Sequence, residues 1–175
     1  MIANRCNLAG IGLGVWALAC SVGSVEGATR GPDPNRLFVI ERSLNANVVV
    51  YDAVRDRTGR LDARDPVEAH WLMNAEHGQR QPLNVIERVK AYGFKVTSRR
   101  GGVELRVAAL DSRPILVRAA GRRIQAVARI AGAPAVLHRV FVRTEAGHPL
   151  HVESVELFGE RLADRRPVHE VMKPE

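Results

Sequence analysis

The chain has 175 residues and a formal net charge of +7, with 26 lysines and arginines against 19 aspartates and glutamates. Its cations are scattered and form no stripe interleaved with aromatic residues, so we expect no nucleic-acid partner. The many arginines are interpreted first as a feature of composition, and second as attraction to an anionic envelope component such as lipid headgroups. Both cysteines, Cys6 and Cys20, precede residue 29, which excludes a disulfide or a cysteine nucleophile in the later residues.

The first 28 residues have the layout of a secretory signal peptide. Arg5 stands near the start, residues 8–20 form an uncharged apolar run, and small residues follow. We therefore predict an exported protein, periplasmic or extracellular, that is cut near residue 28. The alternative is a lipoprotein signal cut before Cys20, whose lipidation would anchor the protein to the outer membrane and is the only membrane attachment we expect. The 147 residues after position 28 suffice for one domain and are too few for two.

The predicted domain, residues 37–160, follows a linker at 29–36 that contains two prolines and a glycine. Its first half is rich in β-branched residues. Strands are predicted there at residues 37–43, 47–53 and 66–74. The intervening polar segments, 54–65 and 76–82, are predicted to be loops.

One helix is predicted, over residues 83–92. Val85, Ile86 and Val89 recur at three- and four-residue spacing, which indicates one apolar face directed at the core. Asn84 is the expected N-cap, and Gly93 follows as a stop signal.

From Phe94 onward the pattern becomes that of an antiparallel meander. Turn signals recur about every ten residues, at positions 101–102, 111–112, 121, 132 and 147. Between them, apolar and polar residues alternate, as in Ile124 to Ile130 and in 150–157. We predict a mainly β fold of about eight or nine strands forming a barrel, with a two-sheet sandwich as the alternative. Residues 161–175 are predicted to be a flexible tail.

Three strings of the chain resemble an uncharacterised family of secreted bacterial proteins, domain of unknown function 4833. They are LFVIERSLNANVVVYDA (37–53), PVEAHWLM (66–73) and IERVKAYGFKV (86–96). The resemblance implies a small exported single-domain protein with no established activity or cofactor. Family members carry a more acidic loop where this chain has residues 56–65, so no functional residue is carried over.

A polar cluster on the first strands and the helix is the best candidate site. Its catalytic candidates are Glu41, Tyr51, His70 and Glu87. Its candidate ligand-binding residues are Arg42, Asn45, Asn47, Trp71, Tyr92 and Lys95. In an enzyme, a carboxylate with a raised pKa would act as general acid or base, assisted by Tyr51 or His70. The alternative, which we favour, is that the glutamates form structural pairs with arginines.

Metal binding has weaker support. In the loop 54–65, Asp56, Asp62 and Asp65 fall at ligand positions of a calcium loop, but Val54 occupies the first position. Four arginines also lie in this loop, so we favour a solvated loop and expect no cofactor.

The function favoured by these observations is non-enzymatic. We expect an exported β-barrel of the cell envelope that binds a small apolar or amphipathic molecule, or an anionic envelope component, at the barrel mouth. The alternatives are an envelope enzyme that uses the Glu/His/Tyr cluster, and a structural or interaction module.

Overall fold

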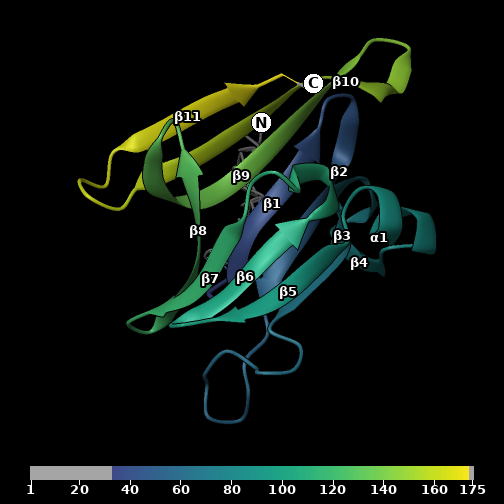
Figure 1. Ribbon diagram of the computed structural model, residues 1–175. Coiled ribbons are helices and arrows are strands. Elements are labelled where there is room, and N and C mark those ends of the chain that lie inside the picture. The colour runs from purple at the N-terminus through teal and green to yellow at the C-terminus, as the bar shows by residue number, and fades with distance from the viewer. Residues whose placement is uncertain (1–32, 174–175) are drawn as a thin grey trace, which may run out of the picture. The chain divides into compact units, whose positions relative to one another are not determined.

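The structure, a computed structural model, describes residues 33–173, and within this range it leaves the side chains of residues 149–150 undescribed (Figure 1). The predicted signal peptide, Cys20 and residues 29–32 of the predicted linker lie outside the described residues. Within the described range, no helix has the length and apolarity needed to cross a bilayer.

The described chain is built mainly of β-strands. The strands are β1 (Arg36–Arg42), β2 (Asn45–Ala53), β3 (Val67–Met73), β4 (Gln79–Pro82), β5 (Phe94–Arg99), β6 (Gly102–Val107), β7 (Ile115–Ala120), β8 (Arg123–Ile130), β9 (Ala133–Glu145), β10 (His148–Arg161) and β11 (Pro167–Met172). One α-helix, α1 (Val85–Lys90), and two single turns of 3-10 helix, η1 (Asn74–Glu76) and η2 (Ala108–Leu110), complete the described elements.

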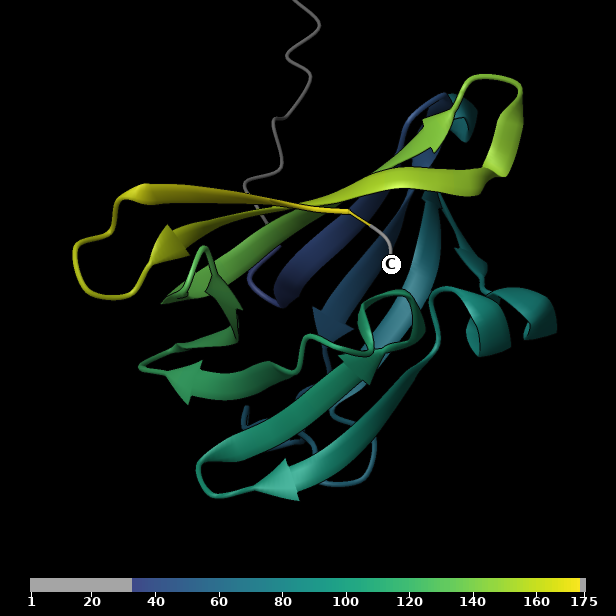
Figure 2. The same cartoon turned by 45° about the horizontal axis from the view of Figure 1, so that its top comes forward.

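All described strands belong to one sheet with β9 at its centre. The order is β4-β3-β2-β1-β9-β8-β7-β6-β5, while β10 pairs with β9 and β11 with β10. One edge of β9 pairs with β8 at residues 133–136 and with β1 at residues 139–142, and β10 runs along the other edge. β1 and β8 pair with different parts of the same edge of β9. The two wings of the sheet, β1 to β4 and β5 to β8, therefore curl toward each other. They form a half-barrel with one parallel pair, β1 with β9, among antiparallel neighbours (Figures 1 and 2).

The hydrophobic core fills the space between the wings. Strand alternation directs every second side chain inward, so Phe38 and Tyr51 from one wing meet Leu105 and Ile130 from the other in one fully buried cluster. The rings of Phe38 and Tyr51 stack with their centroids 4.4 Å apart. Burying each such side chain contributes about 1.5–3 kcal/mol. We call the side of the sheet toward this cluster the inner face, and the opposite side the outer face.

The fold confirms the predicted class, a mainly β chain with one helix, and the two-sheet sandwich is wrong because the strands form one sheet. Two segments differ from expectation. The predicted loop at 76–82 contains β4, which pairs with β3. The predicted flexible tail is wrong for residues 167–172, which form β11 against β10 because Val168 packs into the core.

The orientation predicted for the helix is also wrong. Val85, Ile86 and Val89 are 76%, 74% and 66% exposed. Asn84 is the N-cap as expected, and it forms a capping box with Glu87. Glu87 also accepts a hydrogen bond from the indole N–H of Trp71 at 3.1 Å, which turns the Glu87 side of the helix toward the sheet.

Candidate functional site

Four residues of the predicted polar cluster do come together, in a structural role. The Tyr51 hydroxyl donates to the Tyr92 carbonyl oxygen at 2.6 Å, and the Tyr92 ring meets the edge of the Trp71 ring at 5.3 Å. Trp71 in turn donates to Glu87. Burial raises the pKa of Tyr51, so its hydroxyl stays protonated and acts as a donor to the backbone. These contacts fix α1 and the segment after it on the inner face of β2 and β3.

The other two catalytic candidates lie on the outer face. His70 and Trp71 are neighbours in β3, and neighbouring strand residues point to opposite faces. The His70 side chain is 4% exposed, and within the described residues neither ring nitrogen has a hydrogen-bond partner. Burial and the Arg80 cation lower the pKa of His70, so the ring is neutral. Glu41 forms an ion pair with Arg139 at 3.2 Å. The four catalytic candidates therefore do not converge on one cleft.

The remaining predicted residues have separate surroundings. The Asn45 side chain accepts a hydrogen bond from the Asn47 backbone N–H, and the Asn47 side chain accepts one from Ala75 at 3.3 Å. Both therefore stabilise turns at the ends of strands. Lys95 lines a cavity of about 490 Å³ beside α1.

Two of the three carboxylates predicted as calcium ligands, those of Asp56 and Asp62, are engaged within the loop itself, and Asp65 takes part through its backbone N–H. Asp56 accepts from the Thr58 hydroxyl at 2.7 Å and from two backbone N–H groups, and these bonds lower its pKa. Asp62 accepts from the backbone N–H groups of Arg64 and Asp65. In the part of the chain that the structure describes, no group of three or more His, Cys, Asp or Glu side chains could hold a metal ion.

A cavity of about 720 Å³ lies where α1 and η2 face the strands β9, β10 and β11. Figure 2 shows the end of β11 and the turn with η2 approaching each other there, with α1 beside them. Its lining residues are Arg42, Lys90, Ala91, Tyr92, Ala109, Ser112, Val142, Val152, Val155, Met172 and Lys173. We call this space the mouth cavity.

The lining of the mouth cavity is apolar with a cationic part. Val142, Val152, Val155 and Met172 supply aliphatic surface from three strands, while three cations come from β1, α1 and the end of the described chain. Among the residues that the structure describes, no acidic side chain lines the cavity. An apolar wall beside cationic side chains suits a molecule with a hydrocarbon part and an anionic end.

A distortion of β10 places two of these valines in the cavity together. Val152 and Val155 are three residues apart, so a regular strand would point them to opposite faces, as the alternation in 150–157 predicted. Val152 instead pairs with Thr144 and Ser154 with Arg143, which leaves Glu153 as an extra residue. This β-bulge reverses the alternation, and both valines line the cavity.

Two of the predicted ligand-binding residues, Arg42 and Tyr92, line the mouth cavity, and sequence reasoning missed the others. Five of the nine missed residues come from β9, β10, β11 and the residue that follows, which meet α1 only through the curl of the sheet, and the other four come from α1, η2 and the positions just after them. Lys90 could have been suspected from the sequence, because it directly follows Val89 of the predicted apolar helix face.

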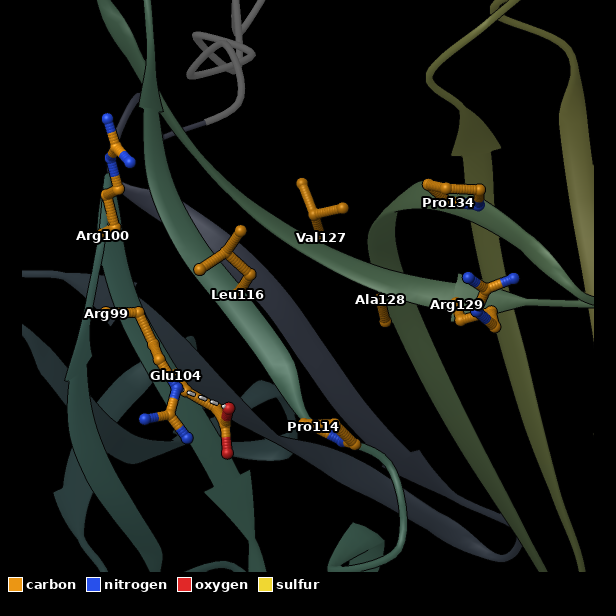
Figure 3. A pocket seen from close by; sticks show the side chains of 9 residues that line it. All are labelled: Arg99, Arg100, Glu104, Pro114, Leu116, Val127, Ala128, Arg129 and Pro134. Atoms are coloured by element: carbon orange, nitrogen blue, oxygen red, sulfur yellow. Dashed lines mark hydrogen bonds and ion pairs between the residues drawn. The ribbon is translucent and has the colours of Figure 1, made fainter.

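A second hollow, of about 540 Å³, lies on the outer face of β6 to β8 (Figure 3). Leu116 and Val127 are paired across its floor, with arginines toward its ends. Glu104 pairs with Arg99 at 3.0 Å, and Arg129 donates to the Gly132 carbonyl. Because the sticks in Figure 3 spread across several strands without converging, this hollow is the weaker candidate.

Comparison with known proteins gives one match. The profile of the family Domain of unknown function (DUF4833) matches residues 38–171, from within β1 to within β11. No curated protein and no solved structure matches the chain. Because the match spans most of the sequence and the whole of the half-barrel from β2 to β10, this chain belongs to the DUF4833 family.

Proposed function

We propose that this protein is an exported, non-enzymatic binding protein of the cell envelope, which holds an anionic amphiphile, such as a fatty acid, in the mouth cavity. The observation that carries the proposal is the composition of the lining: aliphatic side chains and three cations, with no carboxylate among the described lining residues. The proposal of export is supported by the signal-like pattern of residues 1–28.

The size of the cavity fits this class of ligand. Sites for small molecules commonly enclose about 300–1,000 Å³ and are mostly apolar with a few placed polar groups. The mouth cavity, at about 720 Å³, falls within that range. Within the described residues, Lys90 and Lys173 make no ion pair, so their charges are available to a carboxylate or phosphate.

The engagement of the catalytic candidates supports a binding role over catalysis. Tyr51 and Glu87 are held in hydrogen bonds to the backbone and to Trp71, and Glu41 in an ion pair. A general acid or base must instead reach a substrate proton within about 3 Å.

The test is a fluorescence titration of the full chain with 11-(dansylamino)undecanoic acid and with its methyl ester. We expect saturable binding of the acid, and binding of the uncharged ester weaker by about tenfold, or 1.4 kcal/mol. Val155→Trp fills the cavity and should abolish saturable binding, whereas Val127→Trp, in the hollow of Figure 3, should leave it unchanged. Equal affinity for acid and ester, or equal effects of the two tryptophans, would contradict the proposal.

A further inference from the structure

We propose that the outward face of α1 docks this protein onto an anionic membrane surface. The face consists of Val85, Ile86 and Val89, and we call it the α1 ridge. All three side chains are at least 66% exposed, an unusual density of exposed aliphatic surface in a helix of 6 residues. The inference goes beyond the binding function proposed above and does not require the mouth cavity to be occupied.

The ridge is a coherent face of the helix. Successive residues of an α-helix are turned by about 100°, so residues 85, 86 and 89 fall within one sector of about 100°. Glu87 lies on the opposite side, toward Trp71. The helix is thus amphipathic with its apolar side away from the sheet, the reverse of a helix that packs on a core.

The outward orientation of the ridge is fixed by contacts at both ends of the helix. Glu87 accepts from the Asn84 backbone N–H at 2.8 Å and donates its own backbone N–H to the Asn84 side chain at 2.9 Å. Leu83 and Tyr92, on either side of α1, are buried in the core. A rotation that buried the ridge would carry Glu87 away from the Trp71 indole and pull Leu83 and Tyr92 out of the core, so the fold itself holds the aliphatic face outward.

The charges beside the ridge select an anionic surface. Arg88 and Lys90 fall on its two borders, where long cationic side chains can place their charge at lipid headgroups while the ridge enters the interface. Lys95 and Arg106 line the adjoining cavity with Val89. Asp111 is the acidic residue among the described lining residues, and Arg106 is paired with Glu104 at 2.8 Å, so Arg88, Lys90 and Lys95 are the cations near the ridge that make no ion pair within the described residues. Each such cation near an anionic bilayer strengthens attraction to it.

Docking through the ridge would bring the mouth cavity to the bilayer. Lys90 and Ala91, which end α1, line that cavity, and Val89 lies in the adjoining one. A membrane at the ridge therefore lies beside the cavity that we propose for an amphiphile.

Hydrogen exchange measured by mass spectrometry on the full chain tests the proposal. The chain is mixed with vesicles of phosphatidylcholine containing phosphatidylglycerol, and with vesicles of phosphatidylcholine alone. We expect exchange of peptides covering residues 84–94 to slow severalfold on the anionic vesicles only. Unchanged exchange there on anionic vesicles, or equal slowing on both vesicles, would overturn the proposal.

Two variants of the full chain locate the effect. Ile86→Ser/Val89→Ser should lose the slowing, and Val171→Ser, which removes a 55% exposed valine from β11, should keep it. Because all chains share the same N-terminal residues, binding by that segment cannot produce the difference. Slowing that survives the double substitution, or that Val171→Ser abolishes, would contradict docking through the ridge.

Ligand binding in the mouth cavity and membrane docking through the α1 ridge can be refuted independently of each other. Val155→Trp should abolish binding of the dansyl probe and still show slowed exchange at residues 84–94. The double ridge variant should bind the probe normally without vesicles. If Val155→Trp also removed the slowing, docking would depend on the cavity, and the independence proposed here would be wrong.

Discussion

Replacing Tyr51 with phenylalanine should destabilise the fold while preserving its packing. The variant keeps the aromatic ring that stacks on Phe38 and loses only the hydroxyl that donates to the Tyr92 carbonyl at 2.6 Å. Tyr51 is fully buried, so water cannot take the place of the lost donor. The expected change is therefore the loss of one hydrogen bond together with an unsatisfied buried carbonyl.

The magnitude follows from these two parts. The net hydrogen bond contributes about 1 kcal/mol, and leaving a buried acceptor without a partner costs about 1–3 kcal/mol. We expect Tyr51→Phe to lower the free energy of unfolding by about 2–4 kcal/mol. For a domain of this size that corresponds to a fall in Tm of roughly 7–14 °C.

Urea unfolding at pH 7 measures this loss, with Tyr92→Phe as the matched control. Within the described residues the Tyr92 hydroxyl makes no hydrogen bond, so its removal should change the free energy of unfolding by less than about 0.5 kcal/mol. A loss below about 0.5 kcal/mol for Tyr51→Phe, or equal losses for both variants, would refute the assigned role of the hydroxyl.

The stability difference between the wild type and Tyr51→Phe is predicted to change at alkaline pH. Burial raises the pKa of Tyr51, while an unfolded tyrosine titrates near pH 10. The stability from Tyr51 is thus fully present below about pH 10 and is lost as pH rises further, by up to about 1.36 kcal/mol per pH unit. The stability difference between the wild type and Tyr51→Phe should shrink above pH 10, and a constant difference would contradict this.

Two further substitutions test the outer face and the sheet. Burial lowers the pKa of His70, so its contribution to stability is present above an unfolded value of about 6.5 and is lost as pH falls. Urea unfolding between pH 7.5 and 5 should therefore show a steeper loss for the wild type than for His70→Leu, and parallel curves would contradict it. A Cβ at Gly159 would collide with the Val136 carbonyl and approach the Ile130 side chain to 2.7 Å, so Gly159→Ala should cost about 1–3 kcal/mol in the same assay, and an unchanged midpoint would contradict the register of β9 and β10.

The meander could be predicted from the sequence because its signals are local. Gly101 and Gly121 have φ of +85° and +62°, a conformation that glycine adopts without strain, and each lies in the turn between consecutive strands. The parallel pairing of β1 with β9 has no such signal. It joins residues about 100 positions apart and follows from how two separate wings share one edge of β9.

The helix and β10 show why the candidate site could be predicted only in part. The spacing of Val85, Ile86 and Val89 defines an apolar face but gives no direction, and the Glu87 contacts turn that face outward. In β10, the extra residue at Glu153 changes which side chains reach the cavity. Period-two alternation cannot reveal a bulge, because the bulge depends on the pairing with β9.

The central claim, that the mouth cavity holds an anionic amphiphile, is tested most directly by methyl NMR. Valine, leucine and methionine methyl groups of the full chain are observed while dodecanoate is added below its micellar concentration. We predict saturable shifts concentrated at Val152, Val155 and Met172, with Leu116 and Val127 unaffected. Shifts centred on Leu116 and Val127, or no saturable shift at the three mouth-cavity residues, would contradict the account.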